Sequence, residues 1–197
     1  MKDLSILIPT LPARIETLSN LIKKLNKQVI DFGLIDKVQI LTLCDTKEYS
    51  VGKKRNLLLE MSIGKYVCFI DDDDTISDSY LFEIIRAIQS NADVITFCGE
   101  YIEQNKTENF SISKTYKRDY TEGKNIYRLP NHLCPVKIEI ALQSRFPDKS
   151  YGEDSEYATR INRLIKTEYH IKEKLYYYLY SSINSQTNPN NNNNPYS

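Results

Sequence analysis

The chain contains no tryptophan, only two histidines and six glycines in 197 residues, and its 26 basic side chains equal its 26 acidic ones. A zero net charge provides no general attraction to nucleic acid or to anionic membranes. No apolar run approaches the roughly 18 residues of a membrane-spanning helix, and the first residues show no secretory signal. We therefore expect a cytoplasmic protein, with peripheral attachment to a membrane left open.

The four cysteines, Cys44, Cys68, Cys98 and Cys134, are widely spaced and form no Cys-x-x-Cys pair. This spacing favours buried free thiols over a zinc site or disulfides. The length suits one domain with a sizeable core. We expect that domain over residues 1–184. A disordered tail should follow over 185–197, because that segment is Asn, Pro and Ser with almost nothing apolar.

Apolar runs alternate with segments in which apolar residues recur at helical spacing. Strands are predicted at 4–8, 38–43, 66–70, 92–97 and 174–180, and helices at 14–25, 54–61, 79–89, 136–143 and 153–165. Such alternation predicts an α/β fold with a central mixed, mostly parallel sheet flanked by helices. The polar and aromatic stretch from 99 to 130 fits two antiparallel strands at the edge of the sheet.

Four consecutive carboxylates, Asp71 to Asp74, follow directly after the apolar strand at 66–70. Ligands of open α/β sheets bind at the carboxyl ends of strands. Hard oxygen ligands of this kind suit Mg²⁺ or Mn²⁺, which would remove the repulsion between the charges. A solvated acidic turn is the alternative. The position after a strand that is apolar on both faces favours a metal or ligand site.

Other charged features allow two interpretations each. Glu153 and Asp154 could be catalytic, or they could form an acidic first helical turn that the helix dipole favours. The basic residues 53–55 would ordinarily form a solvated helix face. His132 could contact phosphate or acceptor, although a structural or surface role is the commoner one. The tyrosines at 176–180 favour strand packing over sugar stacking.

Taken in order, these motifs resemble those of the family 2 glycosyltransferases, which have the GT-A fold. The resemblance covers roughly residues 4–185, and it rests on Pro9-Thr10, Asp45, Gly52-Lys53-Lys54-Arg55-Asn56, Phe69-Ile70-Asp71-Asp72-Asp73-Asp74 and Tyr151-Gly152-Glu153-Asp154. It implies a single GT-A domain and an inverting, metal-dependent glycosyltransferase. Such an enzyme moves a sugar from a nucleotide-diphosphate donor, with UDP favoured, to an acceptor hydroxyl.

The same resemblance implies roles for individual residues. Pro9 and Thr10 would lie beside the nucleotide, Asp45 would bind the base, and Arg55 would face the base and ribose. Asp71 and Asp72 would belong to the donor site, with Asp71 near the ribose, and Asp73 would bind Mn²⁺ or Mg²⁺. Asp154 would be the general base. Glu153, His132 and Arg160 are the candidates for acceptor or phosphate contacts.

The partners are less sharply specified. Residues 181–185 lack the His or Arg that many members carry there, which leaves the third phosphate or metal contact open. The acceptor is a glycan, a lipid or another hydroxyl compound, and a second subunit of a homo-oligomer could complete its site. Only Lys114, Lys117 and Arg118, near Tyr116 and Tyr120, resemble a nucleic-acid strip, and a solvated loop explains them as well.

Two other functions compete with this one. A Mg²⁺-dependent sugar nucleotidyltransferase has a similar sheet, but it usually carries a glycine-rich basic loop after the first strand, and residues 11–16 contain no glycine. A non-catalytic module that binds nucleotide sugars or glycans would have lost its catalytic acids. The presence of Asp71, Asp73 and Asp154 argues against that module.

Overall fold

A computed structural model describes residues 2–104 and 106–180, and the predicted tail at 185–197 lies outside these ranges. The strands are β1 (Lys2–Thr10), β2 (Val38–Cys44), β3 (Gly64–Phe69), β4 (Thr75–Ile76), β5 (Val94–Glu103), β6 (Lys106–Ile112), β7 (Tyr120–Glu122), β8 (Asn125–Arg128), β9 (Val136–Lys137) and β10 (Glu168–Tyr180). The helices are the short 3-10 helix η1 (Pro12–Arg14) and α1 (Ile15–Asp31), α2 (Val51–Glu60), α3 (Tyr80–Ile88), α4 (Ile138–Ser144) and α5 (Glu153–Leu164).

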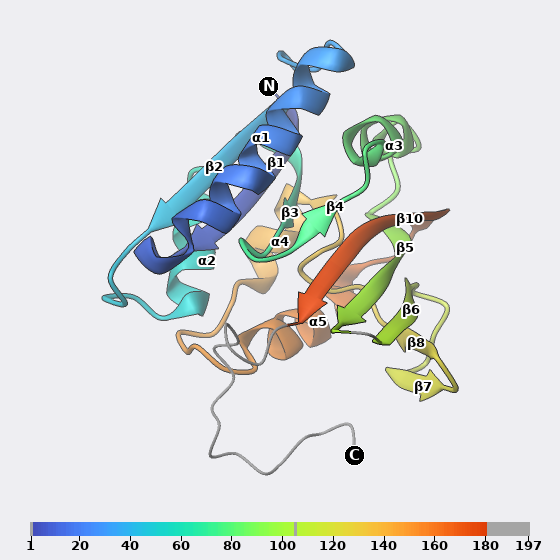
Figure 1. Cartoon of the computed structure of the whole chain (residues 1–197). Coiled ribbons are helices and arrows are strands. Elements are labelled where there is room, and N and C mark those ends of the chain that lie inside the picture. Colours follow the sequence, from blue (N-terminus) through green and yellow to red (C-terminus); the bar gives the residue numbers. More distant parts are fainter. Residues whose placement is uncertain (1, 105, 181–197) are drawn as a thin grey trace.

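The strands form one mixed sheet in the order β2-β1-β3-β9-β5-β6-β8-β7 (Figure 1). The first three strands of this order are parallel to one another. The short strand β9 is antiparallel to both β3 and β5, and it joins the two halves of the sheet. The last strand, β10, runs parallel to β5 and also pairs with β4. The predicted α/β fold with a mixed sheet is therefore confirmed.

Helices cover both faces of the parallel half of the sheet (Figure 1). Helix α1 contacts α3, whereas α2, α4 and α5 contact one another. In α1 the buried residues Leu18, Leu21 and Leu25 recur at helical spacing, which gives the helix one apolar face for the sheet. Strand β1 is buried at every position from Leu4 to Thr10, as expected for a strand packed on both sides.

The structure differs from the sequence-based expectation in several local details. The helix expected at 136–143 begins at Ile138, because Val136 and Lys137 pair with neighbouring strands as β9. The polar stretch after β5 forms β6 and the β7–β8 hairpin, and Tyr120 stacks on Tyr127 with 4.5 Å between ring centroids. The two tyrosines of the supposed nucleic-acid strip, Tyr116 and Tyr120, also pack edge to face, with 6.0 Å between ring centroids.

The cysteines differ in their burial. All four cysteines are free, but only Cys68 and Cys134 are buried, and Cys98 is half-buried. The expectation of a buried thiol is wrong for Cys44, which is exposed near the end of the outermost strand β2. Across the described part of the chain, no helix is both long enough and apolar enough to cross a membrane.

Candidate functional site

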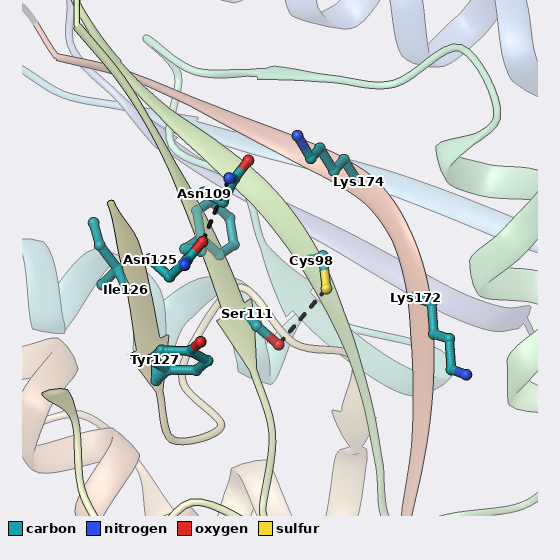
Figure 2. Close-up of a pocket in the computed structure, with 9 residues that line it drawn as sticks. Cys98, Asn109, Ser111, Asn125, Ile126, Tyr127, Lys172 and Lys174 are labelled. Carbon is teal, nitrogen blue, oxygen red and sulfur yellow. Dashed lines mark hydrogen bonds between the residues drawn. The ribbon is translucent and has the colours of Figure 1, made fainter. Parts of the chain in front are cut away.

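Two hollows of similar size stand out among residues 2–104 and 106–180. One, of about 280 Å³, lies over β5, β6, β8 and β10 and is lined by residues such as Cys98, Asn109 and Lys172 (Figure 2). None of the predicted catalytic, donor-binding or metal-binding residues lines it. The other, of about 290 Å³, lies where β1 and β3 end and where α2 and α5 begin. The predicted site residues that line it are Pro9, Thr10, Arg55, Asp71, Asp72, Asp73, His132, Glu153 and Asp154.

Two predicted residues do not line this second cavity. Asp45 follows β2 and accepts hydrogen bonds from Lys54 Nζ at 2.6 Å and from the Tyr49 backbone at 2.8 Å. Lys54 Nζ also donates to the Thr10 carbonyl at 3.0 Å, so Asp45 is linked to the cavity through Lys54. Arg160 is farther away, because its guanidinium donates to the Ser144 carbonyl at 3.2 Å.

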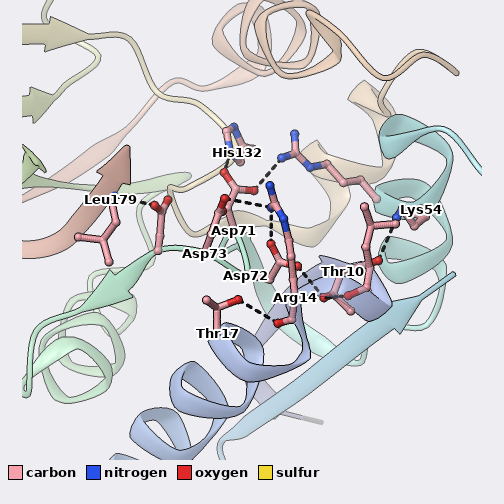
Figure 3. Close-up of polar contacts among 12 residues, drawn as sticks. Thr10, Arg14, Thr17, Lys54, Asp71, Asp72, Asp73, His132 and Leu179 are labelled. Atoms are coloured by element: carbon pink, nitrogen blue, oxygen red, sulfur yellow. Dashed lines mark hydrogen bonds and ion pairs between the residues drawn. The ribbon is translucent and has the colours of Figure 1, made fainter. Parts of the chain in front are cut away.

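Asp72 is the most deeply buried of the four consecutive carboxylates, with 2% of the residue exposed. Thr10 Oγ1 donates to it at 2.6 Å, and Arg14 Nη1 lies 2.6 Å from its other oxygen (Figure 3). A buried carboxylate needs such partners to remain charged. Asp72 therefore anchors the acidic turn to the end of β1 and to η1.

Asp71 lies between two groups that carry or can carry positive charge. Arg55 Nη2 is 3.0 Å from one carboxylate oxygen, and His132 Nε2 is 3.5 Å from the other. Burial favours the neutral acid, but the hydrogen bond from His132 and the charge of Arg55 outweigh it and lower the pKa of Asp71. Asp71 is thus held as a carboxylate inside the cavity wall.

Asp74 is held by two residues of the last strand, β10. The Tyr176 hydroxyl donates to it at 2.6 Å, and the Leu179 backbone N–H donates at 2.9 Å. The same tyrosine oxygen accepts from the Asp71 N–H at 3.2 Å. Burial, together with the charge of Asp71, raises the pKa of Asp74 well above its usual value. The two ends of the acidic turn are therefore joined through one tyrosine.

The side chain of Asp73 retains 26% exposure, as does that of Asp71, and it lines the cavity. Arg14 Nη1 lies 3.0 Å from it. Burial raises the pKa of Asp73 to about 6, with the nearby charges of Asp71 and Asp72 adding to the effect and Arg14 opposing it. A cation placed at this carboxylate would stabilise its charged form.

Arg55 also reaches the helix that carries the proposed base. Its Nη1 lies 3.0 Å from Glu153 Oε1, and its guanidinium carbon lies 5.6 Å and 5.3 Å from the ring centroids of Phe69 and Phe146. Arg55 is only 4% exposed. Burial raises the pKa of Glu153 in spite of the charge of Arg55. This arrangement places Arg55 in the cavity wall between the acidic turn and α5.

The loop before α5 is fixed against the start of α2. Ser50 accepts from the Lys53 N–H at 3.0 Å as the N-cap of α2 and donates to Asp148 at 2.5 Å. The Gly52 N–H donates to the Lys149 carbonyl at 3.0 Å. Gly152 then adopts a left-handed conformation with φ +68° as the N-cap of α5. This path brings Asp154 to the cavity.

Sequence reasoning overlooked or discounted some residues of this site. Arg14 and Tyr178 line the cavity, and Tyr176 binds the acidic turn from behind it. Lys54 was assigned to a solvated helix face, but it is 4% exposed. The four consecutive carboxylates after β3 did indicate that positively charged side chains should lie near them, because buried carboxylates need such partners. The sequence offered no signal to show which cations they are.

The residues of the acidic turn can hold a hard divalent cation only in part. In the described ranges, no three His, Cys, Asp or Glu side chains converge as a ready-made metal site. Mg²⁺ and Mn²⁺ commonly bind through one or two carboxylates and complete their coordination with water and substrate phosphates. Asp73, half-exposed at the cavity, offers one such carboxylate. The donor set therefore fits a cation that binds together with a phosphate ligand.

The structure thus combines a mixed sheet, an acidic turn at a strand end and the Glu153–Asp154 pair at the start of α5, with both acidic groups lining one cavity. The model of the family described as Glycosyl transferase family 2 matches residues 38–146, which is more than half of the chain. The chain belongs to this family. The matched segment includes the acidic turn and Arg55, but it ends before Asp154.

Individual relatives agree with this assignment. The Bacillus subtilis (strain 168) protein named "Putative glycosyltransferase EpsH" is 26% identical over 141 residues, covering 65% of this chain and 41% of EpsH. The crystal structure of S. aureus TarS 1-349 superposes with a TM-score of 0.66 at 17% identity, covering 91% of this chain and 60% of that one. Its complex with UDP-GlcNAc gives a TM-score of 0.64 at 16% identity, covering 92% and 59%.

The chain thus spans about two fifths of EpsH and about three fifths of the TarS fragment. At such low sequence identity the likeness to TarS demonstrates the fold alone. The predicted GT-A fold is confirmed by this likeness. The roles of the individual site residues remain predictions.

Proposed function

We propose that the protein is an inverting, metal-dependent glycosyltransferase that uses a nucleotide-diphosphate sugar, preferably a UDP-sugar. The observation that carries this proposal is that Asp73 and Asp154 face one cavity at the carboxyl ends of β1 and β3. A half-exposed carboxylate for a hard cation and a carboxylate at a helix start supply the two groups that this transfer needs. The structure of TarS with UDP-GlcNAc supports a UDP-sugar donor.

The donor would lie along the acidic turn. Thr10, at the end of β1, would lie beside the nucleotide. Asp71, which Arg55 and His132 keep charged, would approach the ribose. Asp45 would read the base from its position beside Lys54. A divalent cation at Asp73, when bound, would neutralise charge on the diphosphate leaving group. Asp72 would act indirectly, by holding Thr10 and Arg14 in place.

Asp154 would act on the acceptor. Its carboxylate accepts the proton of the acceptor hydroxyl, the hydroxyl oxygen bonds to the anomeric carbon, and the bond from that carbon to the diphosphate oxygen breaks. Attack from the face opposite the diphosphate inverts the configuration. General-base catalysis of this kind contributes about 10²- to 10⁴-fold in rate. The acceptor would be a glycan, a lipid or another hydroxyl compound.

A donor panel tests this function. UDP-, GDP- and dTDP-sugars are incubated with the protein and Mn²⁺ or Mg²⁺, and the slow release of free nucleoside diphosphate is measured. We expect release from a UDP-sugar only when the divalent cation is present. A parallel reaction with UTP and a sugar phosphate examines the nucleotidyltransferase alternative, which would release pyrophosphate. If no donor is hydrolysed and no nucleotide raises the melting temperature, the enzyme assignment is wrong.

A further inference from the structure

Arg14 contacts two carboxylates of the acidic turn at once. A single nitrogen, Nη1, lies 2.6 Å from Asp72 and 3.0 Å from Asp73, so one guanidinium serves two adjacent carboxylates (Figure 3). Asp73 is the carboxylate to which the proposed cation would bind. Arg14 therefore holds a positive charge at the place where a divalent cation would carry its own.

The backbone of Arg14 is fixed, and its side chain lines the cavity. The short helix η1 begins at Pro12, and the Arg14 N–H donates to the Leu11 carbonyl at 2.9 Å. The Arg14 carbonyl accepts from Thr17 Oγ1 at 2.9 Å, which ties it to the first turn of α1 (Figure 3). The side chain lines the cavity and is 19% exposed. The guanidinium is therefore within reach of a ligand that binds in the cavity.

The other carboxylates of the turn are held from different directions. Asp71 is paired with Arg55, and Asp74 accepts from Tyr176 and Leu179. Arg14 pairs with the two central carboxylates, Asp72 and Asp73. A divalent cation at Asp73 would lie close to the positive guanidinium, and like charges repel strongly in a partly buried site. A divalent cation that approaches Asp73 must therefore displace Arg14 or bind beside it against repulsion.

We propose that Arg14 is an exchangeable counter-ion that competes with the divalent cation for Asp73. In the structure Arg14 pairs with both Asp72 and Asp73. When cation and nucleotide bind together, the guanidinium leaves Asp73 and turns to the diphosphate, for which its planar donor set is well suited. The competition concerns this chain alone, whereas the second half of the cycle rests on the proposed function.

This exchange makes the cation and the nucleotide depend on each other. The diphosphate gives Arg14 a new partner, so it lowers the cost of releasing Asp73 to the cation. Coupling of two ligands is reciprocal, so the cation must strengthen nucleotide binding by the same factor. We expect weak binding of Mn²⁺ alone and much stronger binding with UDP.

Direct Mn²⁺ titration tests the competition without any turnover. Free Mn²⁺ is measured by electron paramagnetic resonance for the full chain, for Arg14→Gln and for Arg14→Lys, in the absence of nucleotide. Arg14→Gln should bind Mn²⁺ about tenfold more tightly, as expected from the loss of one charge-assisted contact that competes with the ion. Arg14→Lys keeps the charge but loses the fork geometry, so it should fall between the two.

A matched control removes another positive charge from the same region. Lys27, which pairs with Asp31 on the surface of α1, lies outside the cavity lining. Lys27→Gln should leave the Mn²⁺ affinity unchanged, which separates competition at Asp73 from a general change in charge. Thermal unfolding gives an independent measurement, because Mn²⁺ should raise the melting temperature of Arg14→Gln more than that of the unsubstituted chain.

The outcomes separate this inference from the proposed function. Equal or weaker Mn²⁺ binding by Arg14→Gln, including no binding by either protein, contradicts the competition. If the unsubstituted chain nevertheless hydrolyses a UDP-sugar, the function stands and only the competition fails. If Arg14→Gln binds Mn²⁺ more tightly but neither protein binds UDP, the competition stands and the proposed function fails. With UDP added, the coupling between Mn²⁺ and UDP should be about tenfold smaller in Arg14→Gln.

Discussion

Arg55 on α2 and Glu153, the first residue of α5, form a buried ion pair with 3.0 Å between Nη1 and Oε1, although they are 98 positions apart. The other terminal nitrogen of Arg55 contacts Asp71 at 3.0 Å. One guanidinium thus links the acidic turn after β3 to the helix that carries Asp154. Through this link, the geometry of the proposed donor site and the position of the proposed base depend on the same side chain.

Replacing Arg55 should therefore be costly. Arg55→Gln leaves Asp71 and Glu153 without their shared cation, and breaking a buried pair from one side typically costs about 3–5 kcal/mol. We expect a loss of this order in the free energy of unfolding, measured by equilibrium urea denaturation. Arg145→Gln is the control, because Arg145 pairs at 2.7 Å with Glu60 in an exposed position.

The control should cost no more than about 1 kcal/mol, as exposed ion pairs usually do. If Arg55→Gln were as mild as Arg145→Gln, the bridge between the acidic turn and α5 would carry little of the stability. The expected role of Arg55 at the base and ribose would then gain weight over a structural one.

The hydroxyl of Tyr176 is the subject of a second prediction. Tyr176→Phe removes the donor to the buried Asp74 and the acceptor for the Asp71 N–H, while it leaves the ring in place. An unsatisfied buried group costs about 1–3 kcal/mol, so we expect a loss of that size in urea denaturation. Tyr169→Phe changes a tyrosine of the same strand that is 40% exposed, and it should be neutral. A neutral Tyr176→Phe would mean that Asp74 is satisfied without the hydroxyl.

The fold was largely predictable because its signals are local. The apolar run at 66–70 and the carboxylates behind it are adjacent in sequence, and the end of a parallel strand fixes where such carboxylates lie. Strand β9 was not predictable, because two residues cannot show a period of two. Val136 and Lys137 become a strand only because β3 and β5 leave a gap between them.

The partners of the acidic residues could not be predicted, because they come from distant parts of the chain. Arg14 and Tyr176 lie on opposite sides of the acidic turn in sequence, and only the closed fold brings them to Asp72 and Asp74. The burial of Lys54 was missed for the same reason. A lysine on a helix is expected to be solvated. Only the fold brings the Asp45 carboxylate and the Thr10 carbonyl to Lys54 Nζ.

The role of Asp73 can be tested by donor binding. Asp73→Asn removes the charge of the proposed cation ligand, so we expect Mn²⁺-dependent binding of UDP to weaken at least about tenfold in calorimetry, as the loss of a hard anionic ligand predicts. The fold should persist, because the side chain is only partly buried. Asp78→Asn is the control, since Asp78 is 97% exposed. UDP binding that stays cation-dependent in Asp73→Asn would assign the cation to another residue.

Asp154 is expected to act on the acceptor and not on the donor. Asp154→Asn should lower kcat about 10²- to 10⁴-fold, the usual contribution of a general base, with the affinity for UDP nearly unchanged. Glu139→Gln is a matched control, because Glu139 is also an acidic residue in the first turn of a helix, α4. Both substitutions remove a favourable interaction with a helix dipole, and only Asp154→Asn should lower turnover. Equal activity in the two variants would mean that Asp154 only stabilises the first turn of α5 and is not the general base.

Gly52 is a position where a normally favourable substitution should be harmful. An alanine in place of a helical glycine usually stabilises by up to about 1 kcal/mol. A Cβ at Gly52, however, would lie 1.9 Å from the Pro147 carbonyl oxygen, a backbone atom of the loop that leads to α5. We expect Gly52→Ala to destabilise the protein by roughly 1–3 kcal/mol, as overpacking does. It should also lower transfer more than UDP binding, because the displaced loop leads directly into α5, which carries Asp154. Lys53→Ala, an exposed neighbour in the same helix, should alter neither property. A more stable, fully active Gly52→Ala would show that the 147–152 loop yields without moving the base.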